Sequence, residues 1–176
     1  MSRIFKPICI DLETTGVDPY FNSIVSIGAV DMDNLDNRFY TEFTPFPGAK
    51  IEEESMKIHG LTLDYLYSLR RTESQGINEF AIWLSEFDGL LRVAGYNVHF
   101  DYYFLKYSFD RNERFFPFDY HVLDLFPIFA GMKGYYSDLA GITRFLDLPE
   151  NPKPHNALED ALITAKCLKE LMGDKI

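Results

Sequence analysis

Cysteine and long apolar runs are both scarce in this sequence of 176 residues. The two cysteines, Cys9 and Cys167, form no metal-type CxxC pair and no disulfide framework, so we expect a reducing, cytoplasmic location. No apolar run approaches the roughly 20 residues that cross a membrane, and residues 1–7 are not followed by the apolar stretch of a signal peptide. We therefore expect no membrane association.

Basic residues are also few, since 17 Lys and Arg against 27 Asp and Glu give a net charge of −10. This balance excludes a protein that coats duplex nucleic acid with a broad basic face. It is compatible with a nucleic-acid enzyme that has a small footprint, because divalent metals can supply positive charge locally. The absence of internal repeats and long linkers predicts that residues 1–176 form a single domain.

Apolar periodicity predicts the order of strands and helices. The expected strands are Pro7–Glu13, Ile24–Val30, Arg38–Pro45, Arg92–Tyr96 and Val122–Phe126. The expected helices are residues 77–91 (with Leu91 on the apolar face), Phe100–Tyr107, Tyr136–Leu146 and Ala157–Met172. Three strands followed by alternating helices and strands predict an α/β sandwich with a mixed sheet.

Two acids, Asp11 and Glu13, lie at the end of the first expected strand. Side chains two residues apart share one face of a strand, about 6.6 Å apart, while Ile10 and Leu12 point to the opposite face. Like charges side by side are unfavourable unless a cation neutralises them, and oxygen ligands favour Mg²⁺ or Mn²⁺ over zinc. The alternative is an exposed edge strand with solvated acids.

Four further residues with ionisable side chains stand at or near the starts of later helices. Asp101 falls in a first helical turn, where the helix dipole favours a carboxylate and a purely stabilising role is sufficient. Asp160 directly precedes apolar helix positions, so it can face the sheet. His155 lies in a proline-bounded loop, where a lone histidine is commonly exposed. For Asp124 we expect a helix or turn cap rather than a metal ligand.

Together, the segments DLETTG (11–16), NVHFD (97–101) and HNALEDA (155–161) resemble the three motifs of the DnaQ-like DEDDh 3′–5′ exonucleases. The resemblance runs over nearly the whole chain, and the motifs occur in the family's order. It implies a ribonuclease H-like α/β fold with three α/β/α layers. The expected sheet is mixed and five-stranded, in the order 3-2-1-4-5 with strand 2 antiparallel.

The same resemblance implies two divalent ions, Mg²⁺ or Mn²⁺, held by four catalytic acids: Asp11, Glu13, Asp101 and Asp160. His155, five residues before the last acid, would be the catalytic histidine of the subclass. An imidazole with an ordinary pKa of about 6.5 suits a general base near neutral pH. Asn156 stands where the sister subclass has a tyrosine, which favours the histidine subclass.

Six substrate-binding residues are also implied by the resemblance: Leu12, Thr14, Ile58, His59, Asn97 and Phe100. Ile58 and His59 would help to hold the terminal nucleotide, and Thr14 its sugar. For His59 a structural role is equally consistent with the sequence, and Phe100 is equally well explained as a core residue. Tyr96 departs from the family pattern, in which histidine is common at this position.

The implied activity is hydrolysis of single-stranded nucleic acid, with DNA favoured, from a free 3′ hydroxyl end to nucleoside 5′-monophosphates. Two alternatives stay open. One is an exoribonuclease or oligoribonuclease-like enzyme that trims RNA, and the other is a non-catalytic nucleic-acid-binding module. The segment after the last expected helix is short and does not indicate a polymerase or clamp partner. A homodimer is possible, because aromatic residues such as Tyr135 and Tyr136 could lie on the surface.

Overall fold

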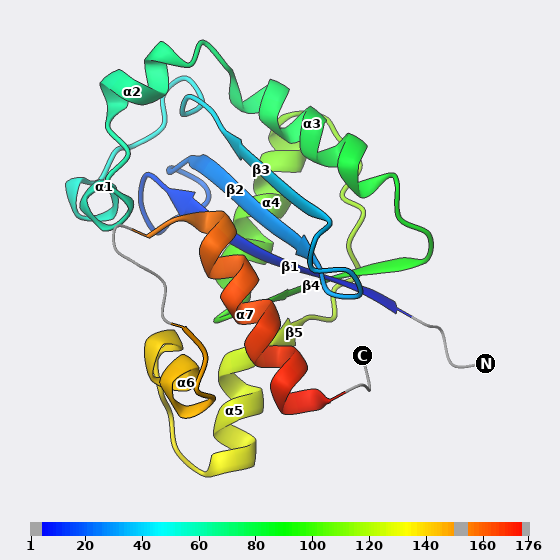
Figure 1. The fold of residues 1–176 in the computed structure, drawn as a ribbon. Coiled ribbons are helices and arrows are strands. Elements are labelled where there is room, and N and C mark those ends of the chain that lie inside the picture. The colour runs from blue at the N-terminus through cyan, green and yellow to red at the C-terminus, as the bar shows by residue number, and fades with distance from the viewer. Residues whose placement is uncertain (1–4, 150–154, 174–176) are drawn as a thin grey trace.

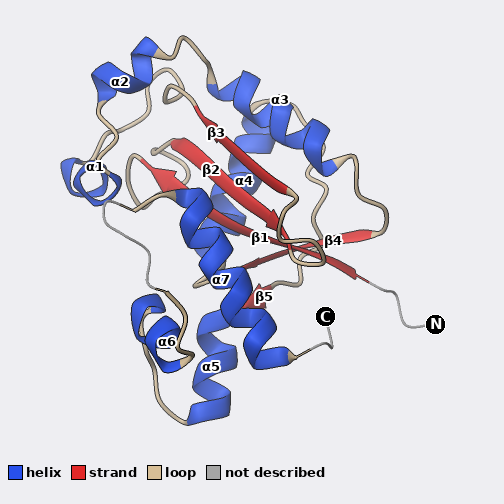
Figure 2. Cartoon of the chain, viewed as in Figure 1, coloured by secondary structure: helices blue, strands red, loops and turns tan. Residues whose placement is uncertain are grey.

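A five-stranded mixed sheet forms the centre of the computed structural model, which describes residues 5–149 and 155–173 (Figures 1 and 2). The strands are β1 (Phe5–Thr14), β2 (Ile24–Asp31), β3 (Arg38–Glu42), β4 (Leu90–Gly95) and β5 (Leu123–Asp124). Their spatial order is β3-β2-β1-β4-β5. β2 runs antiparallel to both of its neighbours, whereas β1, β4 and β5 are parallel. The order and directions confirm the predicted sheet.

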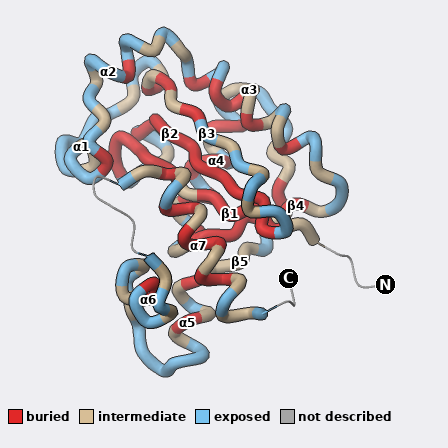
Figure 3. Tube along the Cα trace, viewed as in Figure 1, coloured by how far each residue is buried: buried red, intermediate tan, exposed pale blue. Residues whose placement is uncertain are grey.

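Helices cover both faces of this sheet. They are α1 (Glu53–His59), α2 (Leu63–Ser68), α3 (Glu73–Leu84), α4 (His99–Arg111), α5 (Leu125–Lys133), α6 (Leu139–Phe145) and α7 (Ala157–Met172). α7 crosses one face, with α5 and α6 beside it, and α4 lies behind the sheet (Figure 1). One apolar cluster joins the sheet to α3 and α4, and a second joins it to α5, α6 and α7. β2 is buried along its whole length (Figure 3), as expected for a central strand of a three-layer α/β/α fold.

Alternation along β1 decides which side chains reach the α7 face. Ile10 and Leu12 belong to the apolar cluster of α3 and α4, whereas Cys9 belongs to the cluster of α7. Because alternate residues share a face of a strand, Asp11 and Glu13 lie on the α7 side. The predicted separation of acids from apolar residues along this strand is confirmed.

Several predicted boundaries differ from the structure. Leu91 lies in β4 and not on a helix, because α3 ends at Leu84. The expected strand Val122–Phe126 is only two residues long, because Asp124 caps α5 by accepting a hydrogen bond from the backbone of Phe126. Pro127 falls in the first turn of α5, where a helix tolerates proline. Two of the five residues of the expected strand, Leu125 and Phe126, therefore belong to α5 instead.

Other differences concern short elements. The third strand ends at Glu42 instead of Pro45, and the helix expected from Tyr136 starts at Leu139, after an N-terminal cap by Asp138. α1 and α2 were not predicted as helices. They contain seven and six residues, which is too short for a clear helical period.

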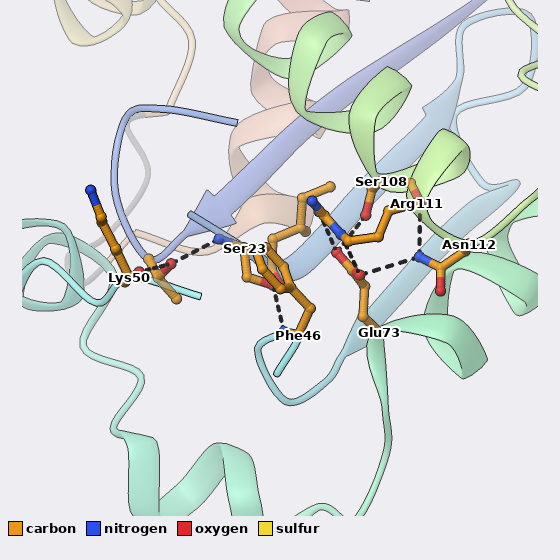
Figure 4. Close-up of polar contacts among 9 residues, drawn as sticks. Ser23, Phe46, Lys50, Glu73, Ser108, Arg111 and Asn112 are labelled. Carbon is orange, nitrogen blue, oxygen red and sulfur yellow. Dashed lines mark hydrogen bonds and ion pairs between the residues drawn. The ribbon is translucent and has the colours of Figure 1, made fainter. Parts of the chain in front are cut away.

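A buried acid, Glu73, ties the start of α3 to the end of α4 (Figure 4). Its carboxylate accepts hydrogen bonds from Ser108 Oγ at 2.6 Å, Arg111 Nη2 at 3.0 Å and Asn112 Nδ2 at 3.2 Å. The guanidinium of Arg111 lies 3.8 Å from the ring centroid of Phe46. Every contact in this network compensates a charge that burial would otherwise make costly.

Candidate catalytic site

A cavity of about 440 Å³ opens where the C-terminal ends of β1 and β4 meet the N-terminal ends of α4 and α7. All five residues predicted to be catalytic line it: Asp11, Glu13, Asp101, His155 and Asp160. These residues come from three distant segments of the chain. The three sequence motifs therefore meet at one place.

Glycine at position 28 explains how α7 comes so close to the sheet. Gly28 is paired with Asp11 across β1 and β2, and a Cβ atom at this position would lie 2.2 Å from the backbone of Ala157 and Leu158. Any side chain at position 28 would push α7 away. The first turns of α7, including Asp160, thus lie directly over β2 and beside the acids of β1.

Three carboxylates form the centre of the site. Asp11, Glu13 and Asp160 each offer an oxygen, and these oxygens lie within 4.8 Å of one another. Glu13 and Asp160 are buried, and Glu13 Oε1 is buried without any hydrogen-bond partner among the described residues. An orphaned anionic oxygen beside two other carboxylates is unfavourable by itself, and a bound cation would relieve it.

Burial and mutual repulsion raise the pKa values of these acids. Burial, together with the negative charge of Asp160, raises the pKa of Glu13 to about 8. Burial also raises the pKa of Asp11, and the charges of Asp101, Glu13 and Asp160 raise it further. These shifts are typical of acids that are gathered at a functional site.

Asp101 faces the same cavity from the first turn of α4 and is 4% exposed. Burial raises the pKa of Asp101, while backbone hydrogen bonds at Asp101 and Leu12 favour its charged form. Its position depends on Asp124, whose carboxylate accepts hydrogen bonds from the backbone of Asn97 at 2.9 Å and Val98 at 3.2 Å. Asp124 also caps α5, which confirms the predicted capping role.

His155 lies just before α7, with nearly half of its side chain exposed. Its Nδ1 atom is 2.9 Å from Asp160 Oδ2. This contact holds the imidazole at the rim of the cavity through its Nδ1 atom. The histidine of the third motif is therefore in contact with the acid of the same motif.

The predicted substrate-binding residues divide into two groups. Leu12, Ile58, Asn97 and Phe100 line the cavity. Ile58 is 58% exposed and Phe100 is partly buried, so both present apolar surface beside the acids. These four positions are consistent with contacts to a terminal nucleotide.

Thr14 and His59 have other partners. Thr14 Oγ1 donates to the carbonyl of Gly16 at 2.7 Å. His59 is buried; its Nδ1 accepts from the backbone of Leu61 at 3.1 Å, and its Nε2 lies 3.3 Å from the carbonyl oxygen of Thr14. Burial lowers the pKa of His59. These contacts favour the structural alternative for His59, as a brace between α1 and the end of β1.

Sequence reasoning missed one wall of the cavity. Asp138, Leu139 and Ala140, at the start of α6, line it together with Tyr96. Asp138 caps α6 by accepting from the backbone of Gly141 at 2.8 Å, and Tyr96 donates to the carbonyl of Ser137 at 3.1 Å. An Asp before a periodic apolar segment signals a helix start, but nothing local places that start beside the acids.

Comparison with known proteins decides the family. A sequence model of the exonuclease family that is named after RNase T matches residues 8–168. The chain belongs to this exonuclease family. Its membership, with relatives that include the epsilon subunit of DNA polymerase III, confirms the DnaQ-like assignment and identifies the protein as a 3′–5′ exonuclease, a hydrolase.

Two relatives show the extent of the similarity. The exonuclease is 26% identical over 190 residues to ribonuclease T of Wigglesworthia glossinidia brevipalpis, covering 97% of this chain and 86% of that protein. It is 30% identical over 183 residues to the DNA polymerase III epsilon subunit of Rickettsia conorii, covering 97% and 75%.

Solved structures confirm the fold of the exonuclease. The nuclease domain of 3′hExo, a DEDDh family member bound to rAMP, superimposes with a TM-score of 0.77 at 16% identity, covering 97% of this chain and 92% of that chain. The zinc-bound complex of E. coli exonuclease I with single-stranded DNA gives a TM-score of 0.78 at 16% identity, covering 97% and 41%. Both have the ribonuclease H-like architecture predicted here.

The residues of the exonuclease fit a divalent cation. Its family generally uses divalent metals, and the three clustered carboxylates supply hard oxygen ligands that suit Mg²⁺ or Mn²⁺. Among the described residues, the Glu13 Oε1 atom has no hydrogen-bond partner, so it is available as a metal ligand.

No helix in the described part of the chain is both long and apolar enough to span a membrane.

Proposed function

We propose that this exonuclease hydrolyses single-stranded nucleic acid, with DNA favoured, from a free 3′ hydroxyl end and releases nucleoside 5′-monophosphates. Asp11, Glu13, Asp101 and Asp160 would hold two divalent ions, Mg²⁺ or Mn²⁺. When bound, the ions would supply the positive charge that stabilises charge developing on the phosphate. Three of these carboxylates, Asp11, Glu13 and Asp160, converge around an unpartnered Glu13 oxygen, and Asp101 lines the same cavity, which supports the proposal.

His155 is the proposed general base. Its position at the rim of the cavity, next to Asp160, suits removal of a proton from the water that attacks the scissile phosphodiester. Hydrogen bonding to the Asp160 carboxylate would stabilise the imidazolium that forms, as an acid partner does for other catalytic histidines. Among the described residues that line this cavity, His155 is the only histidine.

The apolar lining supports a single-stranded substrate. Ile58 and Phe100 would contact the base and sugar of the terminal nucleotide, with Leu12 and Asn97 beside them. Stacking on aromatic side chains holds single strands without reading sequence. The small, acid-lined cavity would admit one terminal nucleotide, so cleavage from an end is expected.

RNA is the second candidate substrate, because several relatives are ribonuclease T proteins and the 3′hExo structure contains rAMP. The epsilon-subunit relatives support DNA. Matched single-stranded DNA and RNA of one sequence, digested side by side with Mg²⁺ or Mn²⁺, would separate these candidates. A 3′-phosphate on either strand should block release of mononucleotides. Normal digestion of the blocked strand would contradict end recognition.

Variants of the acids test the catalytic assignment. Asp101→Asn and Asp160→Asn should abolish metal-dependent digestion while far-ultraviolet circular dichroism stays unchanged. His155→Ala should lower turnover roughly 10²- to 10⁴-fold, the usual contribution of acid–base catalysis. A protein that binds single strands but releases no mononucleotide with either metal would instead be a non-catalytic binding module.

A further inference from the structure

A chain of hydrogen bonds connects the start of α7 to the outer strand of the sheet. Asn156 precedes α7 and uses its Oδ1 atom to cap it, accepting from the backbone of Leu158 at 3.1 Å and Glu159 at 3.3 Å. Its Nδ2 atom donates to the hydroxyl of Tyr40 on β3 at 3.3 Å. Both ends of the Asn156 amide are therefore engaged.

The hydroxyl of Tyr40 is held in turn by an acid. It donates a short hydrogen bond to Glu42, two residues further along β3. Glu42 also accepts a hydrogen bond from Tyr65 on α2 at 2.6 Å. Tyr40 thus lies between a carboxylate anchored on the sheet and the amide that caps α7.

Strand register places Tyr40 on the same face as the catalytic acids. Gly28 pairs with Asp11 on β1 and with Tyr40 on β3, and paired residues in adjacent strands share a face. The first turn of α7 lies over Gly28. It is consequently flanked by Asp11 on one side and by Tyr40 on the other.

We infer that Tyr40 is a positioning residue for His155. His155 directly precedes Asn156, and its imidazole contacts Asp160 one turn into the same helix. The Tyr40 hydroxyl fixes the amide of Asn156, and the amide fixes where the chain enters α7. This inference rests on the proposed role of His155 as general base, and it assigns to β3 a part in catalysis that the sequence motifs do not contain.

Tyr40→Phe removes the hydroxyl and keeps the ring. We expect kcat to fall roughly five- to tenfold, the usual effect of one net hydrogen bond, with KM for a single-stranded oligonucleotide within twofold of wild type. Tyr65→Phe is the matched control, because Tyr65 donates to the same carboxylate, whereas among the described residues Asn156 hydrogen-bonds Tyr40 and not Tyr65. Its kcat should stay at the wild-type value.

A double-mutant cycle separates positioning of His155 from general damage to the fold. If Tyr40 acts through His155, Tyr40→Phe should have no further effect on kcat in a His155→Ala background. Equal losses in both backgrounds, or a wild-type kcat for Tyr40→Phe, would overturn the inference. If His155→Ala itself retained wild-type turnover, the proposed base would be wrong instead, so the two failures are distinguishable.

Discussion

Removing one acid from the cluster of Asp11, Glu13 and Asp160 should make the metal-free protein more stable at high pH. Glu13 is 7% exposed, and burial together with Asp160 raises its pKa from 4.5 to about 8. The folded state therefore binds the Glu13 proton more tightly than the unfolded state does. Stability falls as pH rises from about 4.5 to about 8 and levels off above that.

The size of this effect follows from the difference between the two pKa values of Glu13. At about 1.4 kcal/mol for each pH unit, the interval between 4.5 and about 8 corresponds to at most roughly 5 kcal/mol of lost stability at pH 9. Glu13→Gln removes the ionisation, so the variant should lose several kcal/mol less than wild type between pH 5 and pH 9. Mg²⁺ should restore wild type at pH 9 more than it restores the variant, because the variant lacks one anionic ligand.

Urea unfolding in EDTA at pH 5, 7 and 9 measures this difference. The readout is the change in unfolding free energy between pH 5 and pH 9, so a uniform packing defect in the variant does not affect it. Glu86→Gln, at an exposed glutamate after α3, is the matched control and should follow wild type. Parallel pH dependences for Glu13→Gln and wild type would refute the reasoning.

Three other predictions concern residues that hold the site in place. Glu73→Ala removes the buried carboxylate that accepts from Ser108, Arg111 and Asn112 and leaves the buried Ser108 hydroxyl without its acceptor, so it should cost about 1–3 kcal/mol of unfolding free energy in urea; a cost below about 0.5 kcal/mol would contradict a buried network. Gly28→Ala should displace α7 and abolish digestion, because a Cβ at this position would lie 2.2 Å from the α7 backbone. The far-ultraviolet circular dichroism spectrum should match that of wild type. Wild-type digestion would show that α7 can move without loss of activity. Asp124→Ala removes the acceptor for two backbone N–H groups at the start of α4, so turnover should fall because Asp101 loses its fixed position, and unchanged turnover in steady-state assays would exclude that role.

Several features of the site follow from short-range chemistry and were predicted from sequence. A two-residue period places Asp11 and Glu13 on one face of β1 and the apolar residues on the other. The first-turn position of Asp101 and the capping role of Asp124 depend only on the residues around them. The order of strands in the sheet was predicted from the resemblance of three motifs to one exonuclease family. Relatives share a fold, whereas apolar periodicity alone does not specify the order of strands.

Tertiary structure alone decided which surfaces meet. The start of α6 reaches the cavity, His59 contacts the carbonyl of Thr14, and Tyr40 reaches the cap of α7, and in each case the segments that meet are far apart in sequence. Each depends on the packing of α1, α6 or α7 against the end of the sheet. The packing of α7 is tight at Gly28, where the backbones of β2 and α7 leave no room for a side chain. Local sequence patterns determine the face on which a residue lies. Long-range packing determines its neighbours, because the sequence of one segment does not specify which distant segment it will contact.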